Sequence, residues 1–298
     1  MPDTPHQLRA LTTRLTRPLA PLLRAVQLWL DADGLRMSAA MSFYGMLSLA
    51  PLLLLLVGLL GWWIDKAYLE SSLIAQVQGV MGARGAEVVR MALASAQAPA
   101  QGWLASVAGF VLLLLGATGV FAELQQALQR LWLHGQSAPA RQAWWRMATL
   151  RLRGLAYVLA LGFLLLVSLV LSTAIKMLAT WASALLPFGT GLLLQLLNEA
   201  VSLAVVVLLF LGLMRLGSGP KPPLPCLLFG AAVGAVLFTV GKQLLALYLT
   251  RAAVVSAYGA AGSLVVLLMW IYFSSAVLLF GASCARALEE ARAAVAPG

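Results

Sequence analysis

The chain has 298 residues, of which 62% are hydrophobic and only 10% charged. Soluble domains carry about 25% charged residues, so this composition excludes an ordinary soluble globule and indicates a membrane protein. The net charge of +10 would also fit a nucleic-acid-binding protein. However, the basic residues lie mainly between the hydrophobic runs, as expected of charges that orient membrane spans, so we expect no nucleic-acid partner.

Several apolar runs reach the roughly 20 residues that an α-helix needs to cross the hydrocarbon core of a bilayer. We therefore expect an all-α fold, a polytopic helical membrane protein with six transmembrane helices and flanking amphipathic helices. The transmembrane domain is expected over residues 37–285. Its six spans are predicted at about 37–64, 103–121, 154–175, 192–214, 224–247 and 259–285.

Two further segments have helical periodicity without a run long enough to span. Residues 1–36 alternate leucines with arginines, and we expect them to form a cytoplasmic amphipathic segment on the membrane surface. Residues 65–102 are expected to form an outer-side connection of two short amphipathic helices, divided near Gly82–Gly85.

The distribution of positive charge predicts the orientation of the chain. The connection over 124–153 is rich in arginine, and residues 286–298 form a short charged tail. Lys and Arg are denser in the segments that share one side with both termini, and such charge marks the cytoplasmic face. Both termini are therefore expected in the cytoplasm.

Two ionisable side chains fall inside predicted spans, where charge is costly and indicates a partner or a function. Glu199 is expected about 12 Å and Lys242 about 9 Å from the outer ends of adjacent antiparallel spans, at 1.5 Å of rise per residue. A Glu199–Lys242 pair could fix the register of the two helices. It could equally act as a proton- or substrate-coupled switch in a polar cavity, and both interpretations stay open.

Polar and aromatic side chains of the first span are candidates for lining the same cavity. Ser38 and Ser42 lie one helical turn apart on one face, and Tyr44 follows closely. These three residues, with Glu199 and Lys242, form the predicted substrate-cavity or coupling set.

Glycines mark the predicted helix contacts, because small residues let backbones approach closely in a membrane. Gly230 and Gly234 form a GxxxG motif that Gly241 extends, and Gly116 and Gly119 lie in the second span. Such faces serve contacts within one chain or between copies, which leaves a homo-oligomer open.

Residues for catalysis or metal binding are scarce. The two histidines and two cysteines are isolated in the sequence, and no HExxH, GxSxG or P-loop motif occurs. Two carboxylate pairs, Asp31 with Asp33 and Glu289 with Glu290, could hold a metal, but such flanking charges are more often solvated. We expect no enzyme, no catalytic or metal-binding residues and no cofactor.

Two stretches of the sequence resemble the YihY/BrkB family. Residues 38–51 read SAAMSFYGMLSLAP and resemble the opening span of that family. Residues 258–263, YGAAGS, together with the following WIY and FGA segments, resemble its last span. The resemblance covers about residues 35–288. Ser283, which is followed by Cys284, departs from the pattern, because many members carry an acidic residue after the Gly-Ala of the last span.

The resemblance implies a bacterial inner-membrane protein with six spans, and a function in transport or lipid export. The family was formerly labelled ribonuclease BN, but nothing in this sequence resembles a nuclease centre. We therefore predict a transporter or flippase-like permease for a lipid or other amphiphilic substrate, with membrane lipids as its partners. The alternative is a non-transporting scaffold for envelope machinery, and an integral membrane hydrolase or nuclease is the least favoured reading.

Overall fold

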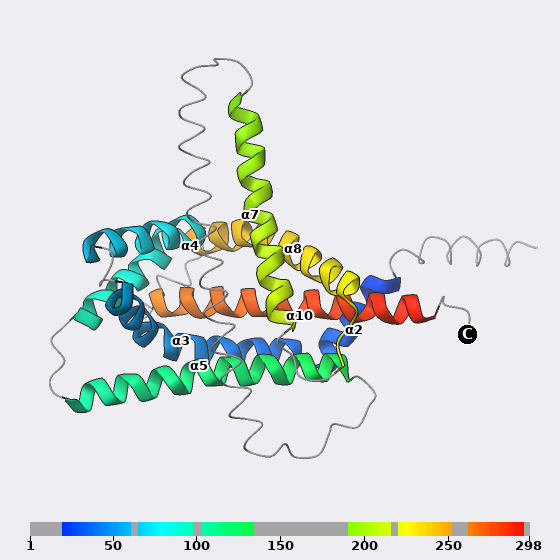
Figure 1. Ribbon diagram of the computed structural model, residues 1–298, viewed down its shortest axis with the longest axis horizontal. Coiled ribbons are helices and arrows are strands. Elements are labelled where there is room, and N and C mark those ends of the chain that lie inside the picture. Colours follow the sequence, from blue (N-terminus) through cyan, green and yellow to red (C-terminus); the bar gives the residue numbers. More distant parts are fainter. Residues whose placement is uncertain are drawn as a thin grey trace, which may run out of the picture. The chain divides into compact units, whose positions relative to one another are not determined.

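Figure 1 shows the computed structural model, in which helices make up the regular structure. The structure describes residues 20–60, 65–97, 103–133, 190–215, 220–251 and 262–294. Across these ranges there is no strand, which confirms the all-α fold class. The helices in these ranges are α2 (Ala20–Asp31), α3 (Gly34–Leu60), α4 (Lys66–Gln97), α5 (Trp103–Trp132), α7 (Thr190–Arg215), α8 (Leu224–Arg251) and α10 (Gly262–Ala293).

Two of the described helices are long and apolar enough to cross a membrane. The apolar stretches are Leu224–Tyr248 in α8 and Leu264–Ala293 in α10, with mean hydropathies of 2.1 and 2.3. The predicted third span, 154–175, lies outside the described residues, so the six-span count stays a prediction. Helix α10 also continues to Ala293, through the first part of the segment expected as a tail.

Helix α4 differs from the prediction of two short helices, because its helical assignment is continuous over Lys66–Gln97. Even so, the buried Val89 packs in one cluster with Ile74 and Val77. The stretch from Val77 to Val89 would measure about 18 Å along a straight helix at 1.5 Å per residue, too far for side chains to touch. The helix must therefore bend between them, where Gly82–Gly85 lie, and Figure 1 shows α4 turning back on itself.

The described helices belong to two compact units. The first unit comprises Met1–Asp33, Ala127–Leu237 and Leu278–Gly298, and so includes α2, α7 and parts of α5, α8 and α10. The second unit comprises Gly34–Gln126 and Phe238–Val277, and so includes α3, α4 and the remaining parts of α5, α8 and α10.

In the first unit, helices α8 and α10 meet backbone to backbone. A Cβ added to Gly230 would collide with the carbonyl oxygen of Gly281 and lie 2.8 Å from the Cβ of Ala285. A Cβ on Gly281 would lie 2.7 Å from the carbonyl oxygen of Gly230 and 3.0 Å from the Cε of Met214 on α7. Only glycine leaves room for this approach, which gives the helices close van der Waals contact.

In the second unit, helix α3 makes similar contacts with α5. A Cβ on Gly116 would lie 2.6 Å from the Cβ of Ser48, and a Cβ on Gly119 would collide with the ring of Tyr44. The other face of α3 reaches α10, because a Cβ on Gly45 would lie 3.3 Å from the side chain of Ile271.

Aromatic rings join α8 to α10 in the same unit. The rings of Phe238 and Phe273 are stacked with centroids 6.1 Å apart, and the ring of Trp270 meets Phe238 edge-on at 6.2 Å. A Cβ added to Gly241 would collide with the ring of Phe273. Such aromatic pairs add about 0.5–1.5 kcal/mol beyond their buried area.

The contact at Gly230 gives a test of helix packing. We expect Gly230→Ala to lower the free energy of unfolding by about 1–3 kcal/mol, because the new methyl group must push the two backbones apart. Thermal unfolding of the purified protein in detergent would measure the change. Ala232→Val, which adds bulk at an exposed position of the same helix, is the matched control. Equal unfolding temperatures for both variants would contradict the close contact.

Candidate functional site

The two predicted cavity serines are buried on α3, with 0% of Ser38 and 5% of Ser42 exposed. The hydroxyl of Ser38 donates a hydrogen bond of 2.7 Å to the carbonyl oxygen of Gly34. The hydroxyl of Ser42 donates one of 2.8 Å to the carbonyl oxygen of Ala39. Both hydroxyl protons are thus used in hydrogen bonds within α3. A substrate could only donate a hydrogen bond to the hydroxyl oxygens.

Tyr44, the third predicted residue of α3, is half-buried. Its ring lies against Gly119 of α5 and meets the ring of Phe43 edge-on with centroids 5.9 Å apart. The aromatic body of Tyr44 therefore contributes to packing between α3 and α5. A role in a substrate cavity stays a prediction for all three residues.

The two predicted charges lie on different helices and in different units. Glu199 is exposed on α7 in the first unit, and Lys242 is half-buried on α8 in the second. Each is the single charged residue in the interior of its helix, since the others, Arg215 and Arg251, end α7 and α8. The Glu199–Lys242 pair itself stays a prediction.

An ion-pair cluster that the sequence did not predict anchors α2 to the end of α10. The Nε of Arg24 donates a hydrogen bond of 2.8 Å to the Oε2 of Glu290. Arg286 contacts Glu289 at 2.5 Å and the second oxygen of Glu290 at 3.4 Å. The hydrogen bond to Glu290 also raises the pKa of Arg24. Glu289 and Glu290 are thus ion-paired, while their side chains remain 27% and 29% exposed.

Apolar contacts accompany this cluster in the first unit. The ring of Trp29 meets the ring of Phe280 edge-on with centroids 6.1 Å apart. Ala25 and Leu28, on the same side of α2, are fully buried. One face of α2 thus packs against α10, while Leu23 on another face remains 60% exposed.

A second ion pair holds the turn between α2 and α3. Asp33 has a positive φ of 57°, which Asp tolerates better than most residues. Its backbone N–H donates to the carbonyl oxygen of Leu30 at 2.9 Å, and its carboxylate accepts a bond of 2.9 Å from Arg130. Asp33 thus stabilises the turn at the end of α2 through both its backbone and its side chain.

In the part of the chain that the structure describes, no three His, Cys, Asp or Glu side chains lie close enough together to bind a metal ion. Cys226 and Cys284 are buried free thiols. Both are small buried side chains of the first unit.

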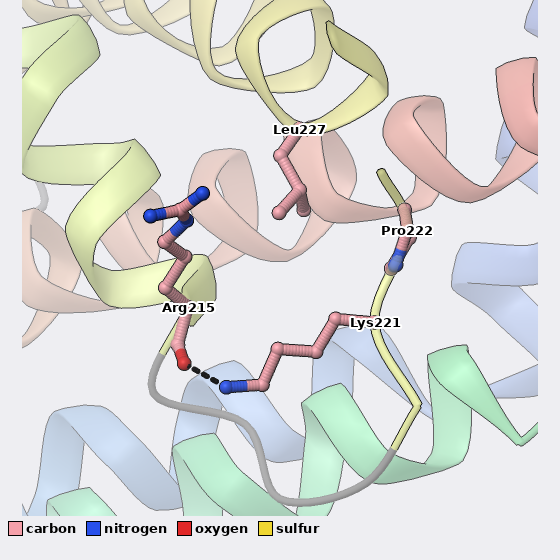
Figure 2. A pocket seen from close by; sticks show the side chains of 4 residues that line it. All are labelled: Arg215, Lys221, Pro222 and Leu227. Atoms are coloured by element: carbon pink, nitrogen blue, oxygen red, sulfur yellow. Dashed lines mark hydrogen bonds between the residues drawn. The ribbon is translucent and has the colours of Figure 1, made fainter. Parts of the chain in front are cut away.

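A pocket at the α7–α8 connection was also missed by the sequence analysis. It has a volume of about 320 Å³ and is lined by Arg215, Lys221, Pro222 and Leu227. Figure 2 shows the four side chains around it, with Arg215 across from Pro222 and Lys221 across from Leu227. The ammonium group of Lys221 donates to the backbone carbonyl of Arg215. The clustering of Lys and Pro after the end of α7 was the available sequence signal.

Comparison with known proteins identifies the family of this chain. Residues 25–298 match the family described as Virulence factor BrkB. The chain belongs to this family. That membership confirms the resemblance found in the opening and closing spans, and it agrees with a helical membrane protein.

Two curated relatives are membrane proteins of the group named UPF0761. The relative from Idiomarina loihiensis is 43% identical over 63 residues, which cover 21% of this chain and 22% of that protein. The relative from Tolumonas auensis is 28% identical over 186 residues, which cover 61% of this chain and 57% of that protein. The chain thus matches less than two thirds of the length of either relative. No solved structure matches.

The cluster at Glu290 gives a second test. We expect Glu290→Gln to lower the free energy of unfolding by up to about 1 kcal/mol, since it removes the charge that joins Arg24 to Arg286 in a partly exposed site. Thermal unfolding would measure the effect. Glu87→Gln breaks an exposed pair within one turn of α4 and should change stability by less than about 0.5 kcal/mol. Equal unfolding temperatures for Glu290→Gln and the unmodified protein would show that the α2–α10 anchor contributes nothing to stability.

Proposed function

We propose that this protein is a multi-pass permease of the bacterial inner membrane, with six spans and both termini in the cytoplasm. It would move a lipid or another amphiphilic substrate in the manner of a flippase. The observation that carries the proposal is the presence of one charged side chain in the interior of each of two apolar helices, Glu199 in α7 and Lys242 in α8.

The exposure of Glu199 supports a polar route through the protein. A carboxylate that faces hydrocarbon is costly, and such groups nearly always face a bundle interior or a water-filled cavity. Glu199 is exposed in this chain although it lies well inside an apolar helix. This exposure supports a route by which water or a polar substrate reaches Glu199.

The energy for transport would come from outside the chain. The sequence holds no P-loop or related nucleotide-binding motif. A Glu and a Lys inside spans can change their protonation or exchange partners, which would couple substrate movement to an ion gradient. Downhill movement of a lipid between leaflets would need no coupling at all.

The proposed orientation can be tested with single cysteines. In a variant whose Cys226 and Cys284 are replaced by alanine, we expect a membrane-impermeant maleimide to label Tyr68→Cys in intact spheroplasts, because α4 is proposed to lie on the outer side. Arg292→Cys, near the end of α10, should react only after the membrane is disrupted. Both positions are exposed in the structure. The reverse pattern would overturn the proposed orientation.

Transport itself can be tested in proteoliposomes that carry a fluorescent phosphatidylglycerol in the inner leaflet. We expect the protein to accelerate the appearance of the label in the outer leaflet, as measured by dithionite quenching. Lys242→Met should reduce the rate at least about tenfold if the charge helps to carry the headgroup, equivalent to about 1.4 kcal/mol of barrier.

Two controls separate a functional from a structural role of Lys242. Gln243→Met changes an exposed neighbour on the same helix and should leave the rate unchanged, whereas Lys242→Arg should restore most of it. Loss of expression with Lys242→Met would favour a role in helix register. If the unmodified protein does not move the lipid, with or without an ion gradient, the scaffold becomes the better account.

A further inference from the structure

The pocket at the α7–α8 connection combines two cations with an apolar floor. Arg215 and Lys221 are exposed, whereas Pro222 is buried and Leu227 is only 2% exposed. None of the described residues that line it is acidic. Because Lys221 binds the last carbonyl of α7, its side chain is held beside Arg215 (Figure 2). Two cations therefore line one cavity, with the ammonium of Lys221 at the α7 carbonyl and the guanidinium of Arg215 on the other side of that residue (Figure 2), and this positive charge favours an anion.

The depth of the pocket in the membrane follows from its position at the start of the apolar stretch of α8. The apolar stretch of α8 begins at Leu224, and the pocket residues Pro222 and Leu227 lie on either side of that point. The first residues of a span lie at the boundary between hydrocarbon and water, where the headgroup phosphates of lipids are found. The cations thus lie at the level of the headgroups.

An exposed stripe on α8 starts at the same point. Leu224, Leu228 and Val236 are 44%, 40% and 51% exposed, and Ala232 between them is also exposed. Residues four apart share one face of a helix, so the four form a continuous apolar strip along the part of α8 in the first unit. A strip of this kind matches the acyl chains of a lipid whose headgroup occupies the pocket.

We propose that the pocket formed by Arg215, Lys221, Pro222 and Leu227 binds the phosphate of one anionic phospholipid, whose chains lie along the strip from Leu224 to Val236. The volume of about 320 Å³ is at the lower end of the range for small-molecule sites, which suits a headgroup and not a whole lipid. This site is separate from the proposed transport residues and does not rest on transport.

Native mass spectrometry of the full-length protein, released from detergent, tests the proposal. Titration with phosphatidylglycerol should show one preferred bound lipid, and phosphatidylcholine should bind more weakly. The double variant R215Q/K221Q should weaken phosphatidylglycerol binding about tenfold, since each cation near a lipid surface contributes measurably to anionic lipid binding. Arg292→Gln removes an exposed cation from the last turn of another helix and should leave the affinity unchanged.

Further measurements keep the test decisive if the double variant folds poorly. The single variant R215Q removes a side chain without touching the bond from Lys221 to the α7 carbonyl, and should weaken binding severalfold. Leu228→Gln should lower lipid affinity through the strip while leaving the pocket charges intact. Inorganic phosphate at millimolar concentration should displace the lipid only weakly, because it cannot use the strip.

Three results would overturn the assignment. Equal loss of lipid with R292Q and R215Q would mean that net charge alone attracts the lipid. Equal binding of phosphatidylglycerol and phosphatidylcholine would exclude a phosphate site that depends on anionic charge. Complete displacement by inorganic phosphate, with no effect of Leu228→Gln, would mean that the pocket binds a free anion and not a lipid.

Discussion

Close contact between helix backbones is the interaction on which the rest of this structure depends. Lipid tails are as apolar as leucine, so helices in a bilayer gain little from burying apolar side chains against each other. They are held by van der Waals contact and short-range polar bonds, and both require close approach. At Gly230 and Gly281 the chain leaves no space for a side chain between α8 and α10, and at Gly116 the α5 backbone lies against Ser48 of α3.

Ion pairs also join distant segments of the first unit. Small residues alone do not determine the register of two helices, because successive glycine and alanine positions offer similar packing surfaces. The bond from Arg24 to Glu290 and the bond from Arg130 to Asp33 each have one geometry. In a partly exposed position such pairs contribute little net stability. Each pair joins residues far apart in the sequence and so ties one segment of the first unit to another.

The sequence predicted the apolar helices well and the contacts between distant segments poorly. Helix α5 begins at Trp103, where the second span was predicted to begin, but it continues past Phe121 to Trp132. The start of α8 was marked by the prolines before Leu224. By contrast, the pair Arg24–Glu290 joins residues 266 positions apart, and nothing local marks it. Two short helices divided at Gly82–Gly85 were predicted, whereas α4 is one continuous helix that bends between Val77 and Val89.

The pocket at the α7–α8 connection was missed although Lys and Pro cluster there in the sequence, because its lining combines the end of α7 with the start of α8. Its position separates it from the proposed transport residues. The two cations lie at the boundary of the membrane, whereas Lys242 is about 22 Å further along α8 than Leu227, at 1.5 Å per residue. One headgroup cannot contact both. A lipid at Arg215 is therefore a resident that supports the α7–α8 connection, and a substrate in transit would have to leave that depth. Tight binding at the boundary and weak binding in the interior are compatible in one protein, because only the interior route requires release.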